Sequence, residues 1–496
     1  MLIQPQFETY RYTGEIDCLH SQSMVECRLP GGEIATILAV QVSAVPTECV
    51  CFDGEVRYGG KVLLCVVYED LDKKICRMER GAEFFHKAEG NAVSPACFAK
   101  VAFSVDNVTH RREGSGVYIS VVVGARVDVY GGKQIEYLSG GENLAVRRGE
   151  ISVCKTVCVS GETEGEDEFE TEYVGDILLH SENALVTRVD VSTGQLNVTG
   201  ELALNVCVLK SDESVCSYER LLNFSVEIPC EEAFGTVKAS ARACVKSAEL
   251  VAGVDEGKGK SKIVFSYVLS IDCFLSQQDT VSVAEDAFSP LAKVGLVKEK
   301  GDSKYLTDTI KCSERVGGVA VLSSLPEGEY FLESAILPRA ELVCKKTERG
   351  VEAEGAVLAD VLLRGSDGGR KCCQLSLPFV FPIEIDGESF IADCIVCGLN
   401  VRRKNGVETE AEATIKACVK GYKNADWEYI REAEEGEAIE EIDSAVSIFV
   451  PIAGETLWDV AKRLSCLPEE VERSNPDLLF PVQEGKRIFV YRQIKR

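Results

Sequence analysis

Histidine, tryptophan and methionine are scarce in this chain, which has 4 His, 2 Trp and 3 Met among 496 residues. The histidines, at His20, His86, His110 and His180, are nowhere spaced as metal ligands, and neither Gly-x-Ser-x-Gly nor His-Glu-x-x-His occurs. Carboxylates are plentiful, but none stands out as a pair in an apolar setting, which acid–base catalysis would need. We therefore predict a protein that is not an enzyme and has no catalytic residue, metal site or cofactor.

Long apolar runs and a basic balance are also absent. No stretch approaches the roughly 20 apolar residues of a membrane-spanning helix. The first ten residues have no basic end followed by an apolar run, which a secretory signal would show. Lys and Arg number 54 against 80 Asp and Glu, so the net charge is −26, which repels nucleic acid and anionic lipid. We expect a cytoplasmic protein with no membrane span and no nucleic-acid partner.

Cysteine, in contrast, is frequent, with 22 residues. Four lie inside apolar runs, where a strand would place a small hydrophobic side chain: Cys65, Cys207, Cys273 and Cys418. The Cys394-x-x-Cys397 pair has no second pair at zinc spacing, and strand alternation would point its two thiols to opposite faces. We predict free, reduced thiols that bind no metal.

The chain is too long for one hydrophobic core, and it contains an internal repeat. With an offset of 140 residues, two glycines and a phenylalanine recur without a gap, since Gly54, Gly60 and Phe84 correspond to Gly194, Gly200 and Phe224. With an offset of 295 residues, Gly60 and Phe84 correspond to Gly355 and Phe379. The copies are rich in β-branched, alternating segments. This predicts a mainly β protein with three tandem antiparallel β-sandwich-like units, in which the three phenylalanines occupy one shared buried position.

The predicted boundaries follow the repeat and the charge runs. The units span residues 1–145, 146–300 and 301–431, and an acidic linker at 432–446 precedes a C-terminal domain at 447–496. We expect an acidic loop at 161–172 inside the second unit. We also expect a short helical turn before each repeated strand set, at 32–38, 175–179 and 330–336.

The last fifty residues predict a strand, two helices and a closing strand. Thr456 and Asp459 form a capping-box pattern, and an apolar helix face follows at Leu457, Val460, Ala461 and Leu464. Pro468 suits the first turn of a second helix, which Asn475-Pro476 ends.

This order of residues resembles the LysM module, through Gly454-Glu455-Thr456-Leu457-Trp458, the helix face, Asn475-Pro476 and Gly485. One departure is Leu467, where a polar N-cap is usual. The resemblance implies a βααβ domain with a ligand groove between two loops, formed by Gly454, Glu455, Thr456, Leu457, Asn475, Pro476, Asp477 and Leu478. In glycan-binding relatives this groove takes an N-acetylglucosamine chain. We also expect an exposed basic rim that would steer an acidic protein partner, made of Lys462, Arg463, Lys486 and Arg487.

The segment Val25–Leu38, followed by the strand pair around Gly60, is similar to the SPOCS domain of spore coat proteins. SPOCS units with a terminal LysM resemble the SipL-type family of spore coat morphogenetic proteins. That resemblance implies a non-catalytic scaffold at the forespore surface inside the mother cell, docking through LysM to the coat basement ATPase (SpoIVA-like) or to another coat protein. The alternative is a protein that binds peptidoglycan or N-acetylglucosamine and attaches to the wall or spore cortex.

Overall fold

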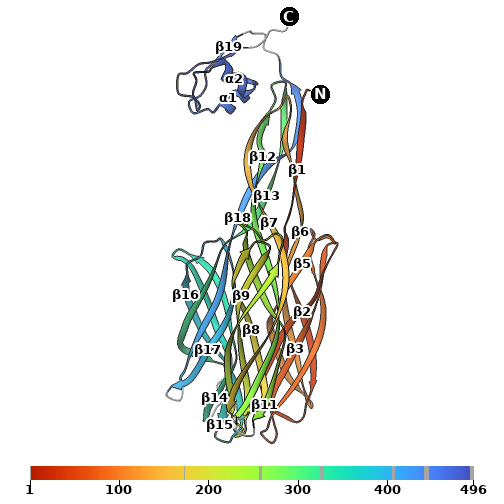
Figure 1. Cartoon of the computed structure of the whole chain (residues 1–496), viewed down its shortest axis with the longest axis vertical. Coiled ribbons are helices and arrows are strands. Elements are labelled where there is room, and N and C mark those ends of the chain that lie inside the picture. Colours follow the sequence, from red (N-terminus) through yellow and green to blue (C-terminus); the bar gives the residue numbers. More distant parts are fainter. Residues whose placement is uncertain are drawn as a thin grey trace.

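The computed structural model describes residues 2–172, 174–255, 260–323, 329–404, 408–440 and 446–491, and within them nearly all regular structure is antiparallel β. The mainly β prediction is confirmed. Figure 1 shows an elongated molecule with three lobes side by side at one end, and a narrow bundle of strands that rises from them toward both chain termini.

Eighteen strands build the lobes and the bundle, six from each repeat. The first six are β1 (Gln4–Pro30), β2 (Ile34–Phe52), β3 (Glu55–Asp70), β4 (Ile75–Glu89), β5 (Phe98–Glu113) and β6 (Gly116–Glu142). The second six are β7 (Ala145–Glu172), β8 (Val174–Ser192), β9 (Gln195–Lys210), β10 (Val215–Pro229), β11 (Lys238–Asp255) and β12 (Lys260–Phe288). The third six are β13 (Ala292–Leu322), β14 (Tyr330–Thr347), β15 (Gly350–Gly365), β16 (Arg370–Ile383), β17 (Ser389–Lys404) and β18 (Glu408–Ala438).

The sheet order repeats from one set to the next. The first set forms the sheets β1-β6-β5 and β2-β3-β4, and the second forms β11-β12-β7 and β10-β9-β8. In the third set, Val321 and Leu322 of β13 pair with β16 and join the two sheets into one of six strands. Each set has its own apolar core. Residues 292–300, which the sequence assigned to the second unit, are part of β13 and pair with β18.

The shared position of the three phenylalanines is confirmed. Phe84, Phe224 and Phe379 are all buried, and they lie directly across the strand pair from Gly60, Gly200 and Gly355. Each ring covers its glycine so closely that an added Cβ would come within 2.6, 2.1 and 2.8 Å of the ring, respectively. The repeated glycine is therefore required by the ring that covers it.

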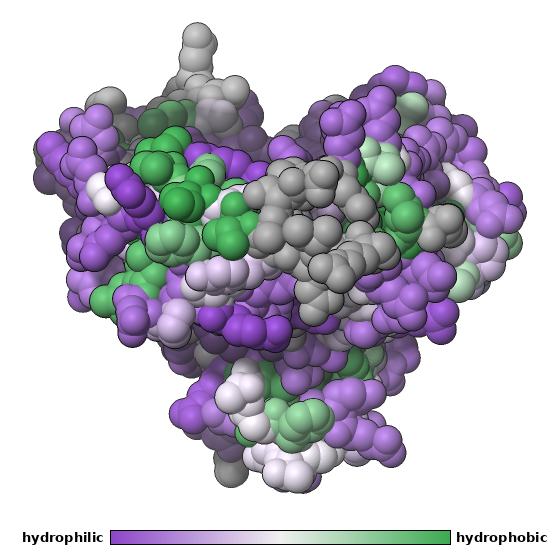
Figure 2. Space-filling model, turned by 90° about the horizontal axis from the view of Figure 1, so that it is seen from above, coloured by the Kyte–Doolittle hydropathy of each residue, from purple (hydrophilic) through white to green (hydrophobic). Residues whose placement is uncertain are grey.

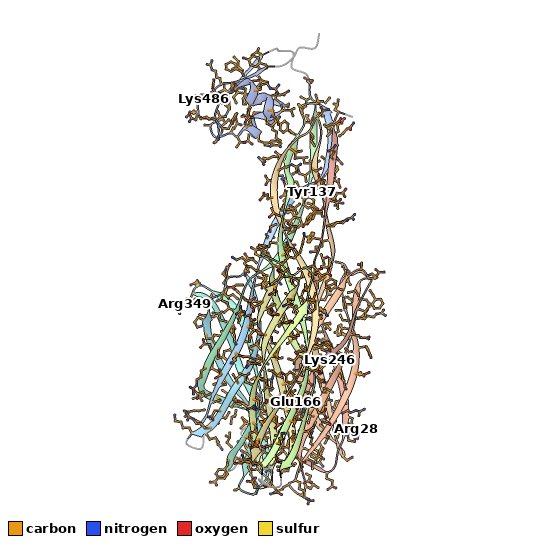
Figure 3. All side chains as sticks on the ribbon, viewed as in Figure 1. Arg28, Tyr137, Glu166, Lys246, Arg349 and Lys486 are labelled. Atoms are coloured by element: carbon orange, nitrogen blue, oxygen red, sulfur yellow. The ribbon has the colours of Figure 1, made fainter. Side chains whose placement is uncertain are left out.

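The stalk, as we call the narrow bundle, is where the first parts of β1, β7 and β13 pair with the last parts of β6, β12 and β18 (Figure 1). Each of these strand pairs forms a two-stranded ribbon: β1 with β6, β7 with β12, and β13 with β18. Apolar side chains from all three ribbons fill the stalk, namely Tyr12, Ile135, Tyr137, Ile151, Val153, Val281, Val283 and Tyr429. Tyr137 marks its position in Figure 3. The three repeats thus share one extended core in addition to their own.

The predicted helical turns are wrong, because the regular parts of these segments begin β2, β8 and β14. Each of these strands carries register shifts there, between Ile34 and Thr36, for example, and between Ile37 and Ala39. A bulge interrupts strict alternation, so apolar residues fall at helix-like spacing in a strand. The side chains involved, including Leu38, Leu178 and Ile336, meet in a core shared by the three lobes.

The acidic loop predicted at 161–172 is also wrong, since these residues belong to β7 and pair with β12. The glutamates occupy every second position and face solvent, while the residues between them face inward, which is strand periodicity. In the predicted acidic linker, residues 432–438 continue β18, and residues 441–445 lie outside the described part of the chain.

Candidate docking site at the tip of the stalk

The C-terminal module comprises β19 (Val446–Phe449), α1 (Leu457–Leu464), α2 (Pro468–Ser474) and β20 (Ile488–Tyr491). The capping box is present, because Thr456 Oγ1 accepts from the Asp459 backbone N–H at 3.3 Å and Asp459 Oδ2 accepts from the Thr456 N–H at 2.9 Å. The helix α2 begins at Pro468 although Leu467 offers no side-chain cap; Glu470 instead accepts from the Leu467 N–H at 3.2 Å. The predicted element order is thus observed.

The predicted groove residues have different roles in the structure. Asn475 is buried, and its amide donates to the Val471 and Phe489 carbonyls at 2.8 and 2.7 Å and accepts from the Phe489 N–H at 2.8 Å. Glu455 accepts from the Ile452 N–H at 2.8 Å and also pairs with Arg463. Asn475 and Glu455 therefore hold the module together.

The other groove residues lie at the surface or in the core. Thr456 caps α1, and Gly454, Pro476 and Asp477 are exposed. Leu457 and Leu478 are brought together, since both pack against the module core. Ligand binding by these residues stays a prediction.

All four rim residues are exposed, as predicted, but two of them also make ion pairs within the chain. Lys462 Nζ lies 2.7 Å from both carboxylate oxygens of Asp286 in β12, and Arg463 pairs with Glu455. Lys486 and Arg487 are exposed in the turn before β20, and Figure 3 shows Lys486 at the outer side of the module. Among the described residues, Lys486 and Arg487 are therefore the two rim residues that make no ion pair.

The module sits on the stalk through α1. Asp286 accepts hydrogen bonds from the Trp458 indole N–H at 2.9 Å and from Lys462. Phe288 meets Trp458 edge to face, with ring centroids 5.0 Å apart, and Ala145 joins the same core. Asp286 and Phe288 were missed by sequence reasoning, because nothing local marks a contact between residues so far apart in the chain.

An apolar patch covers the outward face of the module and was missed as well. It consists of the exposed side chains of the paired strands β19 and β20, namely Val446, Ile448, Phe489 and Tyr491; Val450, Ile452 and Leu479 of the same module are also exposed. Figure 2 looks down on this end and shows apolar residues gathered on the side where the module lies. The alternation from Val446 to Ile452 was a detectable signal, since residues two apart share one face of an extended chain.

We expect Asp286→Ala to release the module from the stalk. Burial alone would raise the pKa of Asp286, but hydrogen bonds from Lys462 and Trp458 and the Lys462 charge outweigh it, so the pKa lies below its ordinary 3.8. Because the folded-state pKa of Asp286 is lower than its ordinary value, the contact contributes its full stability at pH values above the ordinary value. This contribution is lost as the pH falls through the folded-state pKa.

The measurement is Trp458 fluorescence in a Trp427→Phe background, in which Trp458 is the sole indole. Release should shift its emission to longer wavelength and increase quenching by acrylamide. Glu437→Ala, which removes a surface ion pair with Lys293, should change neither. Unchanged emission in Asp286→Ala would show that the contact between the module and the stalk does not depend on this carboxylate.

The cysteines carry free thiols, and those that the structure buries are poor nucleophiles. Burial, for example, raises the pKa of Cys273 to about 12 and that of Cys418 to about 11. Cys394 and Cys397 pack into different apolar clusters, as strand alternation predicted. Within the described ranges, no group of three or more His, Cys, Asp or Glu side chains is placed to hold a metal ion. No helix among the described residues has the length and apolar character needed to cross a membrane.

Comparisons with protein-family models, with curated proteins and with solved structures found no match to this chain.

Proposed function

We propose that this protein is a non-catalytic scaffold of spore coat assembly, which docks to a coat protein, such as the coat basement ATPase, through its C-terminal module. The resemblance to SPOCS and LysM sequences suggests the setting, the mother-cell cytoplasm at the forespore surface. The observation that carries the proposal is the apolar patch, which lies on the module at the end of the molecule opposite the three lobes (Figures 1 and 2).

The patch has the features of a protein-binding surface. Monomeric proteins rarely leave large contiguous apolar areas in water, and such areas mark interaction sites. Here Ile448 and Phe489 are paired across β19 and β20, so their exposed side chains are neighbours on one face. Lys486 and Arg487 lie in the same module of a chain with net charge −26, and they would attract an acidic partner.

The first test is Ile448→Asp. A charge at the centre of the patch should weaken co-purification of the coat basement ATPase more than tenfold, because a buried interface charge without a partner is costly. The matched control is Val380→Asp, on β16 of the third lobe, where valine is similarly exposed. Equal loss in both variants, or loss in neither, would contradict docking through the patch.

The alternative to protein docking is glycan binding, and binding experiments on the same module distinguish the two functions. We expect the protein to bind glycan more weakly than it binds the ATPase. Calorimetry with N-acetylglucosamine oligomers and sedimentation with insoluble peptidoglycan would measure the glycan binding. Lys486→Glu with Arg487→Glu should slow association with an acidic protein and reduce its salt dependence, and leave binding of a neutral sugar unchanged. Tight oligomer binding without co-purification of the ATPase would make the protein a wall- or cortex-binding one.

A further inference from the structure

A cleft of about 340 Å³ opens in the side of the stalk, between the second ribbon (β7 and β12) and the third (β13 and β18). Ile151 and Val283 lie beneath it in the stalk core, 5% and 0% exposed, and the half-buried Trp427 lines it. Its rim is charged. A concave site with a few convergent polar groups is a common form of small-molecule site.

The rim holds four carboxylates and two cations, and both cations are engaged. Arg147 pairs with Glu285 at 3.6 Å and Lys298 pairs with Glu428 at 3.1 Å. The remaining carboxylates are those of Glu150 and Asp426, both exposed, and among the described residues neither has a recorded hydrogen bond or ion pair. The rim therefore presents two unused acceptors.

Trp427 contributes an unused donor. Its six-membered ring lies over Gly301 on the neighbouring strand, where an added Cβ would come within 2.1 Å of Cη2. This contact fixes the indole in place. Its N–H is buried and has no hydrogen-bond partner within the described part of the chain. A buried donor without a partner is unfavourable, and a ligand that supplies an acceptor would relieve that cost.

We infer that this cleft binds a carbohydrate, with one pyranose ring against Trp427. Sugar hydroxyls both donate and accept, so one ring can donate to Glu150 and Asp426 and accept from the indole N–H. The C–H face of the ring would lie against the half-buried Trp427 side chain. An organic cation would satisfy the carboxylates but not the indole N–H, and an apolar ligand would satisfy neither.

This site is separate from the predicted groove of the C-terminal module, and it does not depend on the proposed docking function. Glycan binding by the module would use residues 454–478, whereas the cleft uses the second and third ribbons of the stalk. The ligand class is a neutral sugar, either free or at the end of a glycan chain.

The two tryptophans make the test specific, because Trp458→Phe leaves Trp427 as the sole indole in the full-length protein. Titration of that variant with cellobiose and with N,N′-diacetylchitobiose should produce a saturable change in Trp427 emission that salt does not alter. Adding Glu150→Gln and Asp426→Asn should weaken the response at least tenfold. Both side chains are exposed, so the fold should be unaffected, which circular dichroism would verify. The matched control is Glu136→Gln, an exposed carboxylate on the first ribbon.

Three results would overturn the inference. One is no saturable change with either sugar. Another is an equal response in the Glu150→Gln, Asp426→Asn variant, since the sugar would then bind elsewhere. The third is a response to spermidine alone that salt abolishes, which would make the cleft a cation site. The outcome is also independent of ATPase co-purification, so failure here and failure of the proposed docking function are distinguishable.

Discussion

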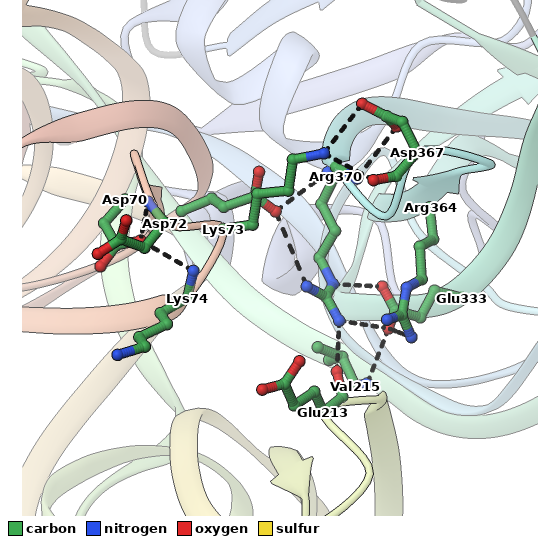
Figure 4. Close-up of polar contacts among 12 residues, drawn as sticks. Asp70, Asp72, Lys73, Lys74, Glu213, Val215, Glu333, Arg364, Asp367 and Arg370 are labelled. Carbon is green, nitrogen blue, oxygen red and sulfur yellow. Dashed lines mark hydrogen bonds and ion pairs between the residues drawn. The ribbon is translucent and has the colours of Figure 1, made fainter.

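Arg370→Met should lower the free energy of unfolding by about 3–5 kcal/mol, the cost typical of removing one partner from a buried ion pair. Arg370 is almost completely buried, with 2% of its side chain exposed. Its guanidinium binds both carboxylate oxygens of Glu333, at 2.8 and 3.1 Å, and its backbone N–H donates to Glu69 at 3.1 Å. Figure 4 shows the contacts with Glu333.

The network joins all three repeats, which is why its loss should be large. The guanidinium lies 3.7 Å from Glu69 of the first repeat, binds Glu333 of the third and donates to the Glu213 carbonyl of the second, whereas the backbone N–H bond to Glu69 would remain in the methionine variant. Without Arg370, the two buried carboxylates would keep only the more distant Arg364, 4.0 Å from Glu333, as a neighbouring cation.

The stability lost in Arg370→Met, which we call the deficit, should depend on pH. Burial raises the pKa of Glu69 above its ordinary value, and the Arg370 backbone and charge offset this only in part. A raised carboxyl pKa favours the folded state when the group is protonated. The deficit of Arg370→Met should therefore be largest near neutral pH and shrink as the pH falls toward the ordinary glutamate range, about 4.3.

Urea unfolding followed by circular dichroism measures the effect. The control is Arg349→Met, an exposed arginine on the third lobe (Figure 3), which should change stability by less than about 0.5 kcal/mol. Equal values for the two variants would show that the Arg370 network contributes nothing to holding the repeats together.

Phe84→Ala should cost about 3–5 kcal/mol, whereas Phe85→Ala, one residue further along β4, should cost almost nothing. Phe84 is 8% exposed, and its ring lies over Gly60 and packs against Phe103 with centroids 5.3 Å apart. Phe85 is 70% exposed on the opposite face of the strand. The pair therefore compares the same side chain at a buried and an exposed position.

The reason for the large cost is that Gly60 cannot fill the space left by the ring. A glycine has no side chain to relax into the cavity, so both strands lose contacts. Phe224→Ala and Phe379→Ala should behave like Phe84→Ala, because each ring covers a glycine in the same way. Unfolding in urea, with hydrogen exchange to locate the weakened lobe, would reveal any difference, and a small loss in all three variants would contradict this account.

The features that the sequence predicted correctly are local or periodic. The repeat, the strand alternation and the capping box of α1 depend on residues a few positions apart, or on an offset that can be read directly. The mistakes have physical causes that were not visible in one dimension. Bulges gave strand segments such as Ile34–Leu38 a helical spacing, and a glutamate at every second position made residues 161–172 look like a solvated loop.

The rest depends on contacts between distant residues. Trp458 and Asp286 are 172 positions apart, and Glu69 and Arg370 are 301 apart, so no local pattern marks either pair. The engagement of Lys462 by Asp286 likewise became evident only when the module was placed on the stalk. The sequence showed that the module carries basic side chains, but it could not show which of them pair with carboxylates of the same chain.

The continuous strands have a mechanical consequence. The strand β18 ends at Ala438 and the module begins at Val446. This strand runs from the third lobe through the whole stalk, paired with β13 from Ala292↔Ala438 to Ala320↔Thr409. A pull between a load on the module and an anchor on the lobes is therefore directed along the strands, at right angles to their hydrogen bonds. In that direction many bonds must break together and not one after another, as they would in a peeled hairpin. The stalk is thus suited to carry tension between the module and the lobes.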